Sequence, residues 1–165
     1  MTLLAGLLII VAAALAQVSI LPAFSIFGVQ PNLLIVLLVI WITVGGQRDA
    51  LLLIPFAGFI QGLLDSQPLG LAMLAMAPLI LMTQVKELRL VQSDLLLAMV
   101  LAAVATLVYE GTLLLTLAVT GERLDWLATV IEVLAPATIA NVLLMLPLYG
   151  LARLFSPGLR RRQAF

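Results

Sequence analysis

The side chains that could do chemistry in this chain are few, and they are mainly scattered carboxylates. The 165 residues include no histidine and no cysteine, which removes the commonest general base, the commonest metal ligand and any thiolate nucleophile. No carboxylate pair, Ser/His/Asp set, HExxH motif or GxxxxGK[ST] motif is present. The sequence therefore predicts that the protein is not an enzyme and that it has no catalytic residues, no metal ligands and no cofactor.

The composition predicts an integral membrane protein. Hydrophobic residues make up 64% of the chain and charged residues 10%, and the mean hydropathy is +1.27. A soluble domain, by comparison, is about half apolar and about a quarter charged. The chain also lacks the basic face that nucleic-acid binding requires. We therefore expect residues 1–165 to form a single transmembrane domain without a nucleic-acid partner.

Six apolar segments separated by short polar turns predict an all-α fold, with six transmembrane helices in one bundle. The expected helices cover residues 3–21, 31–44, 50–64, 69–85, 95–119 and 127–155. We expect the first to be a retained helix rather than a signal peptide, because no basic residue precedes it and no convincing cleavage site follows it.

Proline, glycine and segment length define the expected helix ends. Pro31 would open the second helix, and Gly45 to Asp49 would form a tight turn before the third. The second and third segments have only about 15 residues against the usual ~20, so a re-entrant hairpin is an alternative to two full crossings. Pro136 and Pro147 predict a kinked last helix, or a short interfacial helix followed by a span from about Ala137.

The basic residues predict the orientation. Six crossings place both termini, and the loops after the second and fourth helices, on one side of the membrane. That side collects Arg48, Lys86, Arg89, Arg153, Arg160, Arg161 and Arg162, and the other side has Arg123 alone. Because Lys and Arg mark the cytoplasmic side, we expect both termini in the cytoplasm. The three arginines at 160–162 act as a topology determinant, or in addition contact anionic lipid headgroups.

With this orientation, the polar residues within the spans fall toward the outer half or the midplane. They are Gln17, Asn32, Gln61, Asp65, Glu110, Glu132 and Asn141. Glu110 lies roughly 12 Å inside the fifth helix, and carboxyl groups at such depth usually face the bundle interior. We expect it to be protonated, or hydrogen-bonded to Gln, Asn, Tyr or backbone groups. Two interpretations of Glu110 stay open: it belongs to a partner or ligand site, or it makes internal polar contacts that fix how the helices pack.

The stretch from Ala57 to Leu71 ends one apolar segment, turns, and begins the next. Gly58 and Gly62 are four residues apart, so they lie on one helix face and allow close approach of another helix. The turn is marked by Asp65, Pro68 and Gly70. The candidate packing or partner-interface residues are Gly58, Gln61, Gly62, Asp65, Pro68, Gly70, Tyr109, Glu110 and Asn141.

The order of these motifs resembles the bacterial rod shape-determining protein MreD family over essentially the whole chain. The matching features are Gln17 near the end of the first helix, the stretch Phe27 to Leu34, the stretch Gly58 to Gly70, Tyr109-Glu110, and Asn141 with Pro147 before a basic tail. The block of Asp65 and Pro68-Leu69-Gly70 is the most specific. One position departs from the family, which commonly has Pro-Asp-Leu where this chain has Asn32.

The resemblance implies a non-catalytic, multi-pass scaffold of the bacterial inner membrane that serves the cell-elongation machinery. It implies a complex with MreC, a single-span coiled-coil protein. Through MreC it implies association with the RodA glycosyltransferase, its penicillin-binding transpeptidase and, indirectly, the MreB filament. The implied role is to position or activate the peptidoglycan synthase, within a shell of membrane lipids. We expect the MreC helix to pack in a groove near Gly58 and Gly62.

A substrate-binding subunit of an energy-coupling-factor vitamin transporter is the alternative, because such subunits are also small six-helix membrane proteins. The polar groups of the outer half would then line a vitamin pocket. The outer loops, however, are short and poor in aromatic, hydroxyl and cationic side chains, so a tightly bound polar ligand would find few partners.

Overall fold

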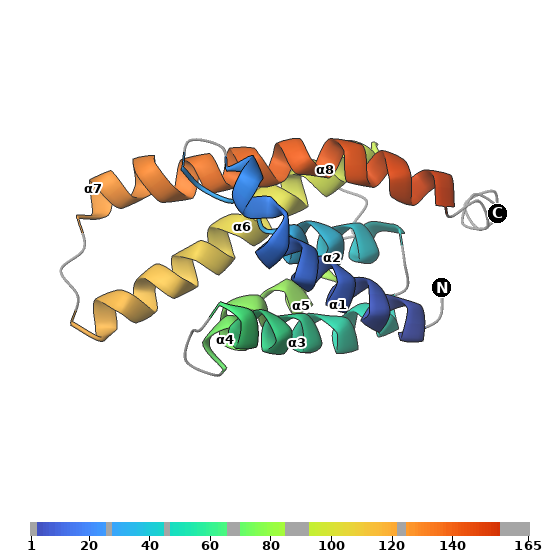
Figure 1. Cartoon of the computed structure of the whole chain (residues 1–165), viewed down its shortest axis with the longest axis horizontal. Helices are drawn as coiled ribbons and strands as arrows, with labels where there is room; N and C mark the ends of the chain where they lie inside the picture. The colour runs from blue at the N-terminus through green and yellow to red at the C-terminus, as the bar shows by residue number, and fades with distance from the viewer. Residues whose placement is uncertain are drawn as a thin grey trace.

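The computed structural model describes residues 3–25, 28–44, 47–65, 70–84, 93–121 and 125–155, and the regular elements within these ranges are all helices. Helix α2 (Leu33–Val44) lies at the centre, in contact with α1 (Leu3–Ser19), α3 (Gln47–Leu64), α6 (Asp94–Val119) and α8 (Ala135–Phe155) (Figure 1). Nine of its 12 residues are buried. A helix that is apolar on every side is buried on every side, and α2 is the core of this fold.

Two groups of helices pack on opposite sides of α2. On one side α1 contacts α3, and α3 contacts both α4 (Leu71–Met76) and α5 (Leu79–Met82). On the other side α6 packs against α8, and the two helices diverge toward the end where α7 lies (Figure 1). Helix α4 also contacts α6, so the two groups meet beside α2 as well as through it. The described residues therefore form six α-helical segments, with α4 and α5 counted as one interrupted segment, and a short 3₁₀ helix, η1 (Leu21–Phe24), follows α1.

Two helix starts differ from the sequence prediction. Helix α2 begins at Leu33 rather than Pro31, because the Asn32 side chain accepts a hydrogen bond from the Ile35 amide, as an N-cap residue does. Helix α3 begins at Gln47 rather than Ala50, so residues 47–49 of the expected turn are helical, while Gly45 and Gly46 lie outside the described residues. Asp49 in its first turn favours that start, because a carboxylate stabilises the positive end of the helix dipole.

The expected fourth helix, 69–85, is wrong as a continuous element. The helix runs from Leu71 to Met76, stops, and resumes from Leu79 to Met82. Pro78 has no amide proton to donate, which removes one bond of the ladder. Beyond it the amides of Ile80, Leu81 and Thr83 bond to the carbonyls three residues earlier, the tighter 3₁₀ spacing.

The last segment is continuous, and neither proline interrupts it. Helix α7 (Trp126–Thr129), a π-helical turn η3 (Val130–Leu134) and α8 follow one another without a break, and Pro147 lies inside α8. The π turn explains how Pro136 is accommodated. At this turn the Ala135 amide donates to the Val130 carbonyl, five residues back. This wider hydrogen-bond spacing keeps the helix continuous up to Pro136, which has no amide proton to donate.

The first residues of α1 and the last of α8 lie at the same end of the bundle (Figure 1). At that end the Arg153 guanidinium lies 3.7 Å from the Asp94 carboxylate at the start of α6. It also stacks 5.6 Å from the centre of the Tyr149 ring. Arg48, in the first turn of α3, lies at this end too. We call it the Arg153 end, and the opposite one the Glu132 end.

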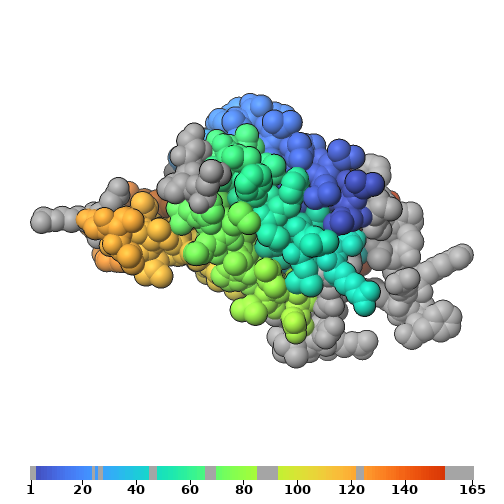
Figure 2. All heavy atoms as spheres, turned by 90° about the horizontal axis from the view of Figure 1, so that it is seen from below, coloured from blue at the N-terminus to red at the C-terminus, as the bar shows by residue number. Residues whose placement is uncertain are grey.

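The helices differ greatly in length. Helix α2 has 12 residues and α6 has 26, which correspond to about 18 Å and about 39 Å. At the Glu132 end, α6 and the α7 segment extend beyond the other described helices (Figures 1 and 2). Within the described residues, Asp94–Val119 and Trp126–Leu154 are long and apolar enough to cross a membrane. The apolar helices Leu3–Ser19, Leu33–Val44 and Leu71–Met82 are shorter.

Candidate functional site

A buried hydrogen-bond network fixes the start of α2. The Asn32 amide donates to Asn141 Oδ1 on α8 at 2.6 Å, and the Leu34 amide donates to Gln17 Oε1 on α1 at 3.3 Å. With the Asn32 cap on Ile35, side chains satisfy three amides that the helix itself leaves open. Gln17, Asn32 and Asn141 were predicted to lie toward the outer half or the midplane of the membrane, and the structure brings them together.

Asn141 connects this network to a fourth helix. Its Nδ2 donates to Thr106 Oγ1 on α6 at 2.8 Å, and that hydroxyl donates in turn to the Ala102 carbonyl at 2.8 Å. Asn141 and Thr106 are both almost fully buried. Thr106 was missed in the sequence analysis, where its only signal is that it is a lone hydroxyl in an apolar stretch of helix.

A second group of polar residues lies between α3 and α6. Gln61 Nε2 donates to Asp65 Oδ2 at 3.1 Å, and the charge of Asp65 acts on both Tyr109 and Glu110. Asp65 is the first residue after α3. Burial raises the pKa of its carboxyl above the ordinary value, and the hydrogen bond from Gln61 partly opposes the rise. Four of the predicted site residues therefore lie together.

This second group is incompletely satisfied. Gln61 Oε1 and the Tyr109 hydroxyl are buried without a hydrogen-bond partner in the described part of the chain. Glu110 is half-buried, and within the same residues it has no hydrogen bond either. The expected bonding of Glu110 to Gln, Asn, Tyr or backbone groups is thus absent among the described residues. The neighbour that the structure gives Glu110 is a second carboxyl group, Asp65.

Gly58 lies where α3 and α4 touch. A Cβ atom placed on it would lie 2.7 Å from Met73 Cα, closer than real Cβ atoms come to another atom, and 3.1 Å from the Ala72 carbonyl oxygen, a tight contact. A Cβ on Gly62 would lie 3.7 Å from Ala72 Cβ, an ordinary contact. At Gly58 the close approach that was expected from a partner helix is made by α4 of the same chain.

The remaining candidate residues lie apart from these groups. Gly70 precedes α4 with φ of +95°, a left-handed conformation that glycine adopts without strain. Arg48 is exposed at the Arg153 end. Pro68, Lys86, Arg89, Arg160, Arg161 and Arg162 lie outside the described residues.

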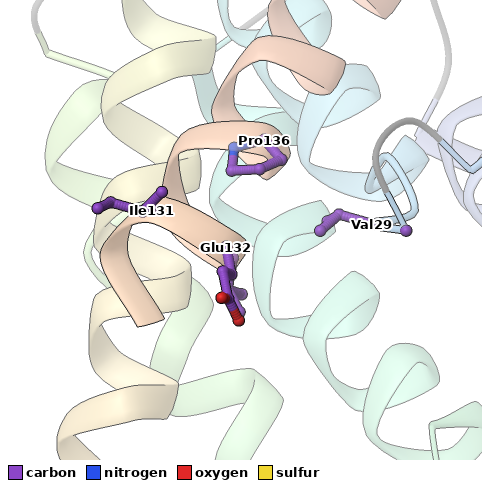
Figure 3. Close-up of a pocket in the computed structure, with 6 residues that line it drawn as sticks. Val29, Ile131, Glu132 and Pro136 are labelled. Carbon is purple, nitrogen blue, oxygen red and sulfur yellow. The ribbon is translucent and has the colours of Figure 1, made fainter. Parts of the chain in front are cut away.

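An open groove at the Glu132 end was not anticipated from the sequence. It has a volume of about 590 Å³ and is lined by Gly28, Val29, Ile131, Glu132, Val133 and Pro136. Figure 3 shows Val29 facing Glu132 and Pro136 across it. Glu132 was noted as an outer-half residue, but no pattern in the sequence indicates that η3 lies opposite the short segment before α2.

These helices define a class. The described chain is wholly helical, its exposed surface is rich in large apolar side chains, and two helices are long and apolar enough to cross a membrane. Among the described residues, no group of three or more His, Cys, Asp or Glu side chains could hold a metal ion. The helices and the apolar surface are those of a helical membrane protein.

The family follows from comparison with known sequences. The sequence model of the rod shape-determining protein MreD matches residues 1–156, and the chain belongs to this family. The resemblance seen in the motifs is confirmed, and with it a role in rod shape determination. MreD is a shape-determining family and not a known enzyme family. A search of curated proteins and a search of solved structures each found no match.

Proposed function

We propose that this protein is a non-catalytic scaffold of the bacterial cell-elongation machinery, crossing the inner membrane six times. The observation that carries the proposal is the family match over residues 1–156, which covers every described helix. The six helical segments support the number of crossings. Helices α2 and α4–α5 are shorter than the bilayer's hydrocarbon core, which is about 30 Å thick. The longer helices α6 and α8 beside them shield part of the membrane thickness that the short helices do not span.

The proposed orientation places both termini in the cytoplasm. It is supported by the start of α1 and the end of α8 lying at one end, together with Arg48 and Arg153 (Figure 1). The opposite end, which would then be the outer one, carries Asp65, Glu110 and Glu132. Within the described residues, this end has no Lys or Arg. Such a distribution follows the rule that basic residues stay on the cytoplasmic side.

The proposed partners are those of the elongation machinery. In this proposal the protein binds MreC through membrane-embedded helix surfaces, because the segments between the helices are short. Through MreC it positions or activates the RodA glycosyltransferase and its penicillin-binding transpeptidase, and it connects indirectly to the MreB filament. Around these contacts its apolar surface meets membrane lipids.

Affinity purification tests this proposal. The tagged protein would be isolated from its own cells in mild detergent, and the co-purifying proteins would be identified by mass spectrometry. We expect a single-span coiled-coil protein, with or without the synthase pair. Recovery of paired ATPases and a transmembrane coupling protein would instead support a vitamin-transporter subunit, and would overturn the scaffold.

A further inference from the structure

The groove at the Glu132 end is an open space between two different parts of the chain. One wall is the segment before α2, with Gly28 and Val29, and the other is the π turn η3 and the start of α8. Gly28 has φ of +80°, so the backbone turns sharply at the rim. The walls are mainly apolar, and Glu132 is the one charged side chain among the lining residues (Figure 3).

The groove continues into a projecting hairpin, made of residues 110–121 and 125–136. Every described residue of this hairpin is half-buried or exposed. Large apolar side chains dominate it, with Val119 81% and Leu127 71% exposed. Elsewhere α6 and α8 each bury a face against the bundle. In the hairpin that face is covered much less: α6 touches η3 there, and Leu113 is the one described hairpin residue that packs against the buried core.

The length of the hairpin explains why it is so little covered. Asn32, Thr106 and Asn141 lie at one level, because they are joined by hydrogen bonds. From that level α6 continues for 13 residues to Val119, or about 20 Å. Helix α2 starts at the same level and runs in the opposite direction, so it does not lie beside this part of α6. In a bilayer, this space beyond α2 must be filled by lipid chains or by another helix, because apolar side chains there are not left facing a void.

Charge favours a helix over lipid chains. The Glu132 side chain is exposed, faces the groove, and has no hydrogen bond or ion pair with any described residue. The described basic residues Arg48 and Arg153 lie at the other end. An ionisable residue at membrane depth is costly unless it is paired. Lipid chains offer no donor, whereas a basic side chain on a partner helix offers both charge and hydrogen bonds.

We propose that this groove receives a single membrane-spanning helix of a partner protein. The helix lies along the inner face of the projecting hairpin. Its apolar side chains pack on Val29, Val133 and Pro136, and one of its Lys or Arg side chains pairs with Glu132. The proposal rests on the scaffold function above, and it assigns the partner's contact to this groove in place of the filled interface at Gly58.

Photocross-linking tests the location. A benzophenone amino acid would be placed at Val133 in the groove, and in a separate variant at Leu81, which is 73% exposed on α5 and lies outside both the groove and the projecting hairpin. Irradiated cells should give an adduct with a single-span protein from position 133 and not from 81. Adducts with lipid alone at position 133, or equal protein adducts at both positions, would overturn the proposal.

Charge substitution tests the pairing. Glu132→Gln should reduce recovery of the partner by about tenfold or more, because one side of a charged hydrogen bond is lost. Glu132→Lys should abolish recovery, and replacing the partner's basic residue by Glu should restore it. Asp49→Asn is the matched control, since Asp49 lies in the first turn of α3, outside both the groove and the projecting hairpin, and it should leave recovery unchanged.

The outcomes separate this proposal from the scaffold function. If the partner co-purifies with the wild-type protein and also, undiminished, with Glu132→Gln and Glu132→Lys, the groove proposal is wrong and the scaffold survives. If no single-span protein co-purifies with the wild type, both are wrong. Membrane levels of each variant, measured by immunoblot, distinguish loss of binding from loss of the protein.

Discussion

Asn141 shows how a single polar side chain organises the centre of the bundle. The amides at the start of a helix need acceptors, and in lipid no water is available to supply them. Asn141 accepts from the Asn32 amide and donates to Thr106, so it joins α8 to both α2 and α6. Because Asn141 is buried, its removal would leave the Asn32 amide without an acceptor in an apolar surrounding, and the Thr106 hydroxyl would keep only its bond to the Ala102 carbonyl.

Replacing Asn141 with Ala should therefore destabilise the fold. We expect the free energy of unfolding to fall by about 1–2 kcal/mol, the usual effect of losing a helix cap or a buried hydrogen bond. Unfolding by heat or SDS in detergent micelles measures it. Leu143→Ala is the control, because Leu143 is 50% exposed on the same helix and should change stability far less. Equal effects of the two substitutions would contradict the role of the network.

The polar residues show what could be predicted at this scale. Depth could be predicted, because the position of Asn32 or Asn141 within its apolar segment follows from the sequence alone. Their pairing could not, because Asn32 and Asn141 are separated by 109 residues, and many arrangements of the helices place polar groups at the same depth. For Glu110, an inward-facing position was expected, whereas the effect of the Asp65 charge on it depends on how the helices are arranged, with α4 in contact with both α3 and α6.

At the scale of the element, the contact between α3 and α4 depends on the absence of a side chain. The backbone of α4 approaches Gly58 so closely that any Cβ would overlap Met73. Two prolines act on their helices in different ways. Pro78 separates α4 from α5, whereas Pro136 follows a π turn and leaves its helix continuous. Sequence patterns indicate that a proline perturbs a helix, but the response depends on the neighbouring turns.

Gly58→Ala should push α4 away from α3. We expect a loss of about 1–3 kcal/mol in the free energy of unfolding, because the atom that the new methyl group meets is backbone and cannot rotate aside. Gly111→Ala is a matched control on α6, where a Cβ meets nothing within 4 Å. It should leave stability unchanged or raise it by about 0.5–1 kcal/mol, as alanine does in a helix. Similar losses at both glycines would show that packing at Gly58 is not the cause.

At the scale of the whole molecule, the fold is a short, fully buried helix enclosed by longer ones. Apolar composition predicts six helical segments, but it does not predict their order around α2, since every segment is apolar on most of its surface. Only α2 is buried all round, and the remaining helices keep large exposed apolar side chains such as Leu4 and Leu81. This surface suits a lipid environment. Because it is apolar on all sides, the orientation of the protein across the membrane depends on the charged residues at its two ends.

The orientation can be tested by cysteine accessibility, because the chain has no cysteine of its own. Thr120 is exposed just after α6 at the Glu132 end, and Gln84 is exposed after α5 at the opposite end. In intact cells, a membrane-impermeant maleimide should label Thr120→Cys and not Gln84→Cys, because only the first would lie outside. After the membrane is opened, both should react, which controls for the reactivity of each site. Labelling of Gln84→Cys alone in intact cells would reverse the orientation. It would also remove the scaffold's proposed outer face, since the carboxylates at Asp65, Glu110 and Glu132 would then lie toward the cytoplasm.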